Sequence, residues 1–195
     1  MSTHVFFLLD MTGSMSRNKE ATIDACNEFI GAQQSNPGAD DSVFTLGVFN
    51  SNIGLERIVR EVSLDRAPRI DHEHYRPDGA TPLYDAIGET MTLLESHTGP
   101  VLFIIQTDGE ENSSRRVTRE EVLAQVAEKT AAGWQFVYLG CDIEPAELAH
   151  EQRPASGERH AVRDAYGQPG EDDERSTGIP ISFVECASCR GEKEA

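Results

Sequence analysis

A short apolar run that stops at a carboxylate constrains this chain more than any other feature. Val5 to Leu9 is too short for a helix, and its unbroken apolar character is typical of a strand buried on both faces. Asp10 follows where such a strand would leave the sheet, and Thr12 and Ser14 come next in a glycine-containing turn. In open parallel α/β sheets, ligands bind beyond the carboxyl ends of the strands. One carboxylate and two hydroxyls at such an end predict a cradle for a hard cation.

The rest of the chain alternates helical and strand patterns. A helix is predicted over Lys19–Gln34, and two strands within 42–49 and 53–62 are joined so closely that they must form an antiparallel hairpin. The next elements are a helix that begins at Pro82, with Thr81 as its N-cap, and a core strand over 101–105 that leads to Asp108. A helix opened by a Thr118/Glu121 capping box and ended near Gly133 follows, and then a core strand over 135–139. This order predicts an α/β, Rossmann-like fold, with a mostly parallel central sheet, one antiparallel edge strand and helices on both faces.

Length and composition favour one such domain followed by an extension. The chain has 195 residues, of which 38% are hydrophobic, and this is enough for a real core. The clear alternation of elements occupies residues 1–142. Residues 143–195 are interpreted as a C-terminal extension, with helical stretches at 144–150 and 159–166, an acidic loop at 168–178 and an edge strand within 179–184.

The charge of the chain excludes several classes of partner. A formal net charge of −17 argues against nucleic acid and against an anionic membrane surface.

No apolar stretch approaches the ~20 residues of a spanning helix, and the N-terminal run is too short for a signal peptide. The expected location is therefore the cytoplasm. Four cysteines do not make a disulfide framework, so reduced thiols are expected.

Three loops are predicted to meet at the carboxyl edge of the sheet. They bring together two carboxylates and three hydroxyls, which belong to Asp10, Thr12, Ser14, Thr81 and Asp108. Hard oxygen donors of this kind suit Mg²⁺, which takes about six ligands near ~2.1 Å and usually keeps some water. The set contains no His or Cys, which disfavours zinc and copper.

These motifs resemble those of von Willebrand factor A (VWA) domains with a metal-ion-dependent adhesion site (MIDAS). The family's Asp-x-Ser-x-Ser motif reads DMTGS here (residues 10–14), its lone loop threonine matches Thr81 in GATPLYDAI, and its second aspartate matches Asp108 in TDGEEN. Thr12 replaces the usual serine and keeps the hydroxyl. The resemblance covers about residues 3–142 and is nearest to small stand-alone bacterial or phage members.

The resemblance implies a binding module without catalytic activity. Ser14, Thr12 and Thr81 would be direct ligands in varying combinations, and Asp10 and Asp108 would hold Mg²⁺ directly or through water; Mn²⁺ or Ca²⁺ are alternative ions. One coordination position would stay open for an Asp or Glu of a partner protein. Two carboxylates about neutralise the ion, and hydroxyl and water ligands leave it able to attract a third.

Two other functions remain open at this stage. DMTGS also resembles the phosphorylation loop of haloacid-dehalogenase-type enzymes, in which Asp10 would be the nucleophile and Asp108 would hold the metal. Against it, this chemistry needs a cationic side chain near the transferred phosphoryl group, and Lys129, within a helix and away from the loops, is a poor candidate. In addition, Thr81 follows a polar loop, and Asn112 stands where a further acid is needed. The third alternative is a structural scaffold whose site never fills.

Several weaker motifs favour ordinary structural roles. His72 and His74 lie on a polar loop without a second ligand pair, so exposure is the better interpretation. Glu110 and Glu111 are expected in a solvated loop, although they are close enough in sequence to approach the ion. Cys186 and Cys189 have the spacing of half a zinc site, but the other half is missing.

Overall fold

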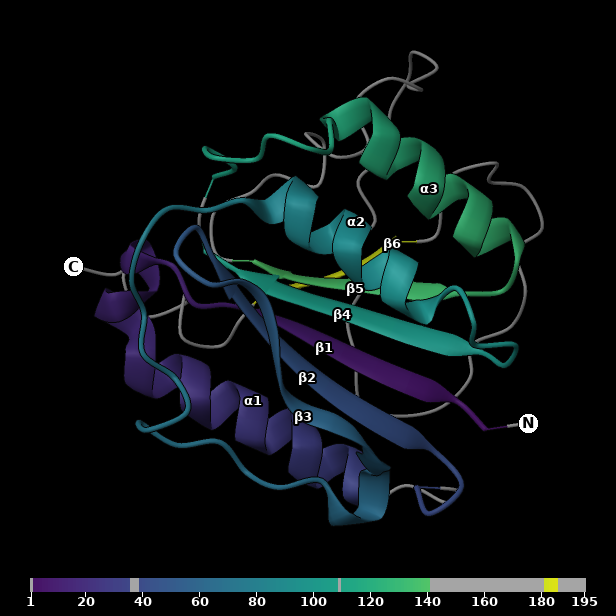
Figure 1. Cartoon of the computed structure of the whole chain (residues 1–195). Coiled ribbons are helices and arrows are strands. Elements are labelled where there is room, and N and C mark those ends of the chain that lie inside the picture. Colours follow the sequence, from purple (N-terminus) through teal and green to yellow (C-terminus); the bar gives the residue numbers. More distant parts are fainter. Residues whose placement is uncertain (1, 36–38, 109, 141–180, 186–195) are drawn as a thin grey trace, which may run out of the picture.

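A six-stranded sheet forms the centre of the molecule, in the order β3-β2-β1-β4-β5-β6 (Figure 1). The computed structural model describes residues 2–35, 39–108, 110–140 and 181–185. The strands are β1 (His4–Asp10), β2 (Val43–Asn50), β3 (Gly54–Ser63), β4 (Val101–Thr107), β5 (Gln135–Gly140) and β6 (Ile181–Glu185). All neighbouring pairs are parallel except β2 and β3, which form the predicted antiparallel hairpin. The predicted α/β fold class is confirmed.

Helices cover both faces of this sheet. Helix α1 (Lys19–Gln34) lies on one face, and α2 (Leu83–Leu94) and α3 (Arg119–Ala131) lie on the other (Figure 1). Short 3₁₀ helices, η1 (Gly13–Asn18) and η2 (Leu64–Arg66), precede α1 and follow β3. The capping box that opens α3 is present, and Gly133 takes the positive φ of +93° expected just beyond its end.

Strand β1 is buried along its whole length, as its continuous apolar sequence predicted. Successive side chains of a strand point to opposite faces, so the side chains of β1 pack alternately in two hydrophobic cores. Val5, Phe7 and Leu9 pack in the core beneath α1. Phe6 and Leu8 pack in the core beneath α2 and α3. The alternation of two apolar faces fixes β1 in the centre of the sheet.

The position of β1 also determines where a ligand can bind. Its neighbours are β2 on one side and β4 on the other, so the chain winds outward in two directions from this point. Ligands of open α/β sheets bind at such a switch point, beyond the carboxyl ends of the strands. Asp10 is the last residue of β1, and Asp108 directly follows β4. The fold therefore places both acids at one edge of the sheet, on adjacent strands.

The last described strand adds to the same sheet. β6 pairs in parallel with β5 at the edge, within one or two residues of the strand predicted at 179–184. The predicted helices at 144–150 and 159–166, the acidic loop at 168–178, the boundary near residue 142, and Cys141, Cys186 and Cys189 lie outside the described residues. Cys26 is a buried free thiol on α1.

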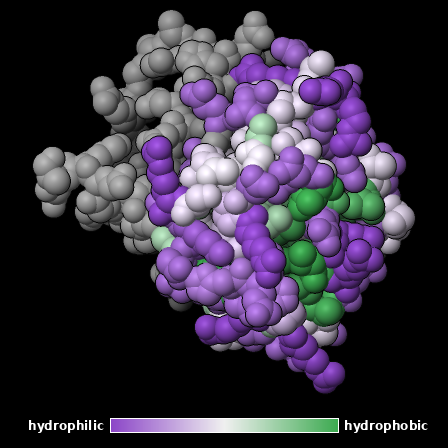
Figure 2. Space-filling view, turned by 60° about the vertical axis from the view of Figure 1, so that its left-hand side comes forward, coloured by the Kyte–Doolittle hydropathy of each residue, from purple (hydrophilic) through white to green (hydrophobic). Residues whose placement is uncertain are grey.

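Figure 2 shows a face on which hydrophilic residues predominate and hydrophobic ones gather in one strip. None of the described helices has both the length and the apolar character needed to cross a bilayer.

Candidate metal site

The loop after β1, residues 11–18, is bonded tightly to the core. Asp10 is fully buried, and its carboxylate accepts the Thr12 backbone N–H at 2.7 Å and the Thr107 hydroxyl. The carbonyl oxygen of Asp10 accepts the hydroxyl of Tyr75 at 2.6 Å. Both the side chain and the main chain of Asp10 are therefore held in one orientation by hydrogen bonds.

A chain of oxygen atoms continues from this loop to Asp108. The hydroxyls of Thr12 and Ser14 lie 3.1 Å apart, and the Ser14 hydroxyl donates to a carboxylate oxygen of Asp108 at 3.0 Å. Neighbouring ligands at ~2.1 Å from an octahedral Mg²⁺ are separated by about 3.0 Å, because they subtend a right angle at the ion. The Thr12–Ser14 and Ser14–Asp108 separations are those of ordinary hydrogen bonds, and they are also compatible with neighbouring ligands of Mg²⁺.

The backbone places Thr81 in the same region. Residues 78 and 79 lie against the first loop, because the Gly13 N–H donates to the Gly79 carbonyl at 2.9 Å and the Asp78 N–H to the Met11 carbonyl at 3.0 Å. Gly79 has a φ of +76°, and a Cβ there would lie 2.8 Å from the Ser51 hydroxyl, so this close approach requires glycine. Thr81 follows two residues later and is buried.

Asn112 joins Thr81 to the loop after β4, residues 108–118. The Asn112 side-chain oxygen accepts the Thr81 N–H at 2.8 Å, and the Asn112 N–H donates to the Thr81 carbonyl at 3.1 Å. The structure thus links Asp10, Thr12, Ser14 and Asp108 through one run of hydrogen bonds. It brings Thr81 beside them through contacts of its main chain.

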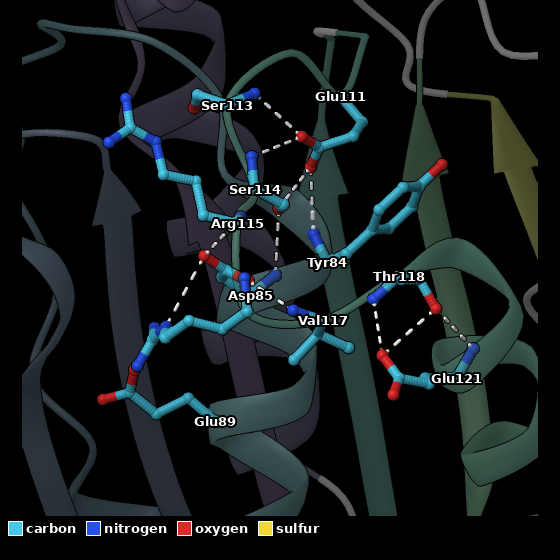
Figure 3. Close-up of polar contacts among 11 residues, drawn as sticks. Tyr84, Asp85, Glu89, Glu111, Ser113, Ser114, Arg115, Val117, Thr118 and Glu121 are labelled. Carbon is cyan, nitrogen blue, oxygen red and sulfur yellow. Dashed lines mark hydrogen bonds and ion pairs between the residues drawn. The ribbon is translucent and has the colours of Figure 1, made fainter.

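The expected N-cap role of Thr81 is wrong. Helix α2 begins at Leu83, its cap position is Pro82, and no side chain at that position caps it. The carboxylate of Glu111 instead accepts the Tyr84 N–H at 3.1 Å, and the hydroxyl of Ser114 accepts the Asp85 N–H at 3.1 Å (Figure 3). Because Glu111 and Ser114 cap the start of α2, the Thr81 hydroxyl does not serve as the helix cap that the sequence predicted. Glu111 is thus half-buried and bonded, contrary to the expectation for it, whereas Glu110 is exposed as expected.

Asp85 completes this junction from the helix side. Its carboxylate accepts the backbone N–H groups of Arg115, Arg116 and Val117 at 2.8–3.0 Å (Figure 3). Burial works against the charged carboxylate, but these hydrogen bonds and the Arg116 guanidinium outweigh it and lower the pKa of Asp85. The loop after β4 is therefore fastened to the first turn of α2.

The electrostatics of the site favour a cation. Burial raises the pKa of Asp10, hydrogen bonds from Thr107 and Thr12 oppose that rise, and the Asp108 charge adds to it. Burial and the charges of Asp10 and Asp108 also raise the pKa values of the phenols of Tyr75 and Tyr138. A divalent ion would offset this concentration of buried negative charge.

Other candidate ligands lie elsewhere. His72 and His74 are exposed, as expected, and are paired with Glu20 and Asp71 respectively. Among the described residues, no three His, Cys, Asp or Glu side chains gather closely enough to hold a metal. The predicted ligand set has only two carboxylates, with three hydroxyls, so it is not a cluster of three such side chains. Lys129 lies in the last turn of α3 over the Trp134 ring.

Sequence reasoning missed three residues that build the site. Tyr75 lies in a stretch interpreted only as polar and irregular, yet it is fully buried; a lone aromatic in such a stretch was the available signal. Thr107 directly precedes Asp108, and the alternation along β4 indicates which way its hydroxyl points. Asn112 gave no local signal, because its partner lies 31 residues away.

No protein-family model and no curated protein sequence matches the chain. Several solved structures share its fold. The SpRpn10 VWA domain matches with a TM-score of 0.55 and 10% identity over 96% of this chain and 90% of that one. Manganese-loaded TRAP protein from Plasmodium vivax matches with a TM-score of 0.57 and 17% identity over 96% of this chain and 70% of that one. The chain has a VWA-like fold.

Pilus proteins share this VWA-like fold as well. The PilB minor pilin from Streptococcus sanguinis matches with a TM-score of 0.53 and 16% identity over 72% of this chain. The chain spans about half of that pilin, since 50% of its length is covered. At these identities the likeness concerns the VWA-like fold alone.

Proposed function

We propose that this protein is a metal-dependent protein-binding module with a MIDAS-type site. Asp10, Thr12, Ser14, Thr81 and Asp108 hold Mg²⁺, and Mn²⁺ or Ca²⁺ can replace it. One coordination position is left for an Asp or Glu of a partner protein. The partner is neither nucleic acid nor membrane, in keeping with the net charge of −17. The proposal keeps the expectation of a cytoplasmic protein of bacterial or phage type.

The observation that carries the proposal is the spacing of the oxygen atoms of Thr12, Ser14 and Asp108. Their separations of 3.0 and 3.1 Å match the edge of a Mg²⁺ octahedron, about 3.0 Å. They come from two loops separated by 94 positions in the sequence. Asp10 is buried, whereas Ser14 is exposed and Asp108 half-buried, so the site opens toward solvent on the side where a partner would approach.

The charges of the ligands support a binding role. Two carboxylates about neutralise a divalent ion, and the hydroxyls add no charge. The ion can therefore still bind an incoming carboxylate as a further oxygen ligand. The structural neighbour TRAP is described as manganese-loaded, which supports Mn²⁺ as a probe of the site.

The environment of Asp10 favours this role over phosphoryl transfer. A nucleophilic carboxylate must reach the substrate, whereas Asp10 has no exposed surface and both of its oxygens accept hydrogen bonds. Lys129, the cationic candidate weighed from sequence, lies at the end of α3 that adjoins Trp134. We therefore propose no catalytic activity.

Metal-dependent capture tests the proposal. The wild-type protein is immobilised and exposed to proteins of its host, once with Mg²⁺ and once with EDTA. We expect a specific partner to be retained only with Mg²⁺ and to be lost with Asp108→Ala. Asp24→Ala, at an exposed position of α1, removes the same charge away from the site and should retain the partner. Capture that survives both EDTA and Asp108→Ala would contradict the proposal.

A further inference from the structure

A pocket of about 320 Å³ lies beside the proposed metal site. Its walls come from three segments: the turn between β2 and β3, the first turn of α2, and the loop before α3. Leu55, Pro82 and Ala86 give it apolar surface, and its charged wall residues are Arg115, Arg116 and Asp85. The Asp85 carboxylate already accepts backbone hydrogen bonds from the loop before α3, so the pocket combines an apolar wall with two cationic side chains and one acid that is already bonded.

The pocket is built from the same residues that position the metal loops. Pro82 directly follows Thr81 in the chain. Ser51 exchanges two hydrogen bonds with Ala80, both of 2.9 Å, through its N–H and its hydroxyl. Asn50, another wall residue, donates its side-chain N–H to the Met11 carbonyl at 3.1 Å. A partner that reaches the ion is therefore within reach of the pocket.

The two arginines differ in what their charges already contact. The Arg116 guanidinium pairs with Glu89 at 2.9 Å and with Asp85 at 3.5 Å. Arg115 is exposed, and Figure 3 shows its side chain extending away from the carboxylates of Asp85 and Glu111. Within the described part of the chain, its guanidinium has no ion pair or hydrogen bond. Of the two arginines in the pocket wall, Arg115 is therefore the one whose charge is available to an incoming acid.

We propose that the pocket is a second recognition site for the partner that binds the metal. The occupant is a linear segment of a partner protein with an apolar residue flanked by two acidic ones. One acid ligates the ion, the apolar side chain enters the pocket, and the second acid pairs with Arg115. This inference rests on the proposed function and assigns the chemistry of its partner. Arg and carboxylate form paired hydrogen bonds of defined geometry, so Arg115 would select the second acid.

A library of random linear peptides displayed on phage tests this inference. The library is panned against wild-type protein in Mn²⁺ and eluted with EDTA. We expect enrichment of sequences with two acids around an apolar residue. Panning against Arg115→Glu should retain one acidic position and lose the other. Arg66→Glu makes the same charge change on η2, at the amino ends of the parallel strands and so away from the pocket. Panning against this variant should enrich the same peptides as panning against wild type.

Fluorescence anisotropy of the enriched peptide then measures how much the Arg115 contact and the apolar contact each contribute to the binding affinity. In Mn²⁺, Arg115→Glu should weaken binding about 10-fold or more, and Arg66→Glu less than about 2-fold. Replacing the apolar residue of the peptide by glycine should weaken binding to wild type about 10-fold.

The possible results separate the two proposals. Enrichment of a single acid in Mn²⁺, or a pattern unchanged by Arg115→Glu, would overturn the pocket inference and leave the metal-dependent function standing. No enrichment that depends on Mn²⁺ would overturn both.

Discussion

The two loops that supply the acids of the proposed site are anchored in different ways. The loop after β1 is bonded to the core of the fold: Asp10 accepts from Thr107 and Tyr75, and Met11 accepts from Asn50. The loop after β4 is bonded to the start of α2 instead, through Glu111, Asn112 and the backbone that Asp85 holds. One loop is part of the folded core, and the other is attached to its surface.

This difference predicts that substitutions around the two loops have different consequences. Damage to the anchors of the first loop should lower the stability of the whole domain, because those anchors are buried side chains. Damage to the anchors of the second loop should mainly shift Thr81 relative to Asp108. Stability and metal affinity can therefore be separated by choosing the loop that is altered.

The largest expected effect is that of Tyr75→Ala on the first loop. Tyr75 is fully buried and its hydroxyl bonds to Asp10, so truncation should lower the free energy of unfolding by about 3–5 kcal/mol. Tyr75→Phe keeps the ring and should cost only about 1 kcal/mol. Urea denaturation monitored by circular dichroism measures both. A cost below about 1 kcal/mol for Tyr75→Ala would break the comparison, because the first loop would then not depend on the core.

Lowering the pH should destabilise the domain through His4, which lies at the opposite end of β1 from Asp10 and outside both loops. His4 is buried against Thr45 and His97, and burial, with the nearby His97 as a smaller cause, lowers its pKa to about 4. Between pH ~6.5 and ~4 the unfolded chain binds the proton and the folded chain does not. Stability should therefore fall across this window, by about 3 kcal/mol in total. Urea denaturation at successive pH values measures it, and His4→Gln should flatten the dependence; an equally steep slope in that variant would assign the acid sensitivity to another group.

Two asparagines allow a paired test of the second loop. The Asn112 side chain accepts the Thr81 N–H at 2.8 Å, and its backbone N–H donates to the Thr81 carbonyl; Asn27, on α1, makes both of its bonds to the Ile70 backbone, each of 2.9 Å, through its side chain. Asn112→Leu should weaken Mn²⁺ binding about 10-fold, as other changes behind metal ligands do, with under about 1 kcal/mol lost in stability. Asn27→Leu should show the reverse, a cost of about 1–2 kcal/mol with unchanged Mn²⁺ affinity. Calorimetric titration and urea denaturation measure the two quantities, and equal effects of both variants on Mn²⁺ affinity would contradict the distinction.

The fold and the placement of Asp10 and Asp108 at one edge of the sheet were predictable from sequence, because both leave local patterns. An apolar run that stops at Asp10, and another that leads to Asp108, indicate two buried parallel strands, and parallel strands end at one edge. The anchors were not predictable in this way. Glu111 and Asn112 bond to residues 27 and 31 positions away, and no period or motif marks such a partnership. Thr81 illustrates the consequence: its sequence context indicated a helix cap, but tertiary contacts gave that role to another loop.

Direct titration with Mn²⁺ tests the central claim, that loops after β1 and β4 hold one divalent ion between them. Isothermal calorimetry of the wild-type protein should show one bound Mn²⁺. Asp10→Asn and Asp108→Asn should each weaken binding by more than about 100-fold, because changes behind the ligands already cost about 10–100-fold. Asp24→Asn, on the exposed side of α1, should bind as wild type does. A wild-type protein that takes up no Mn²⁺ at millimolar concentration, or equal binding by all four proteins, would contradict the claim.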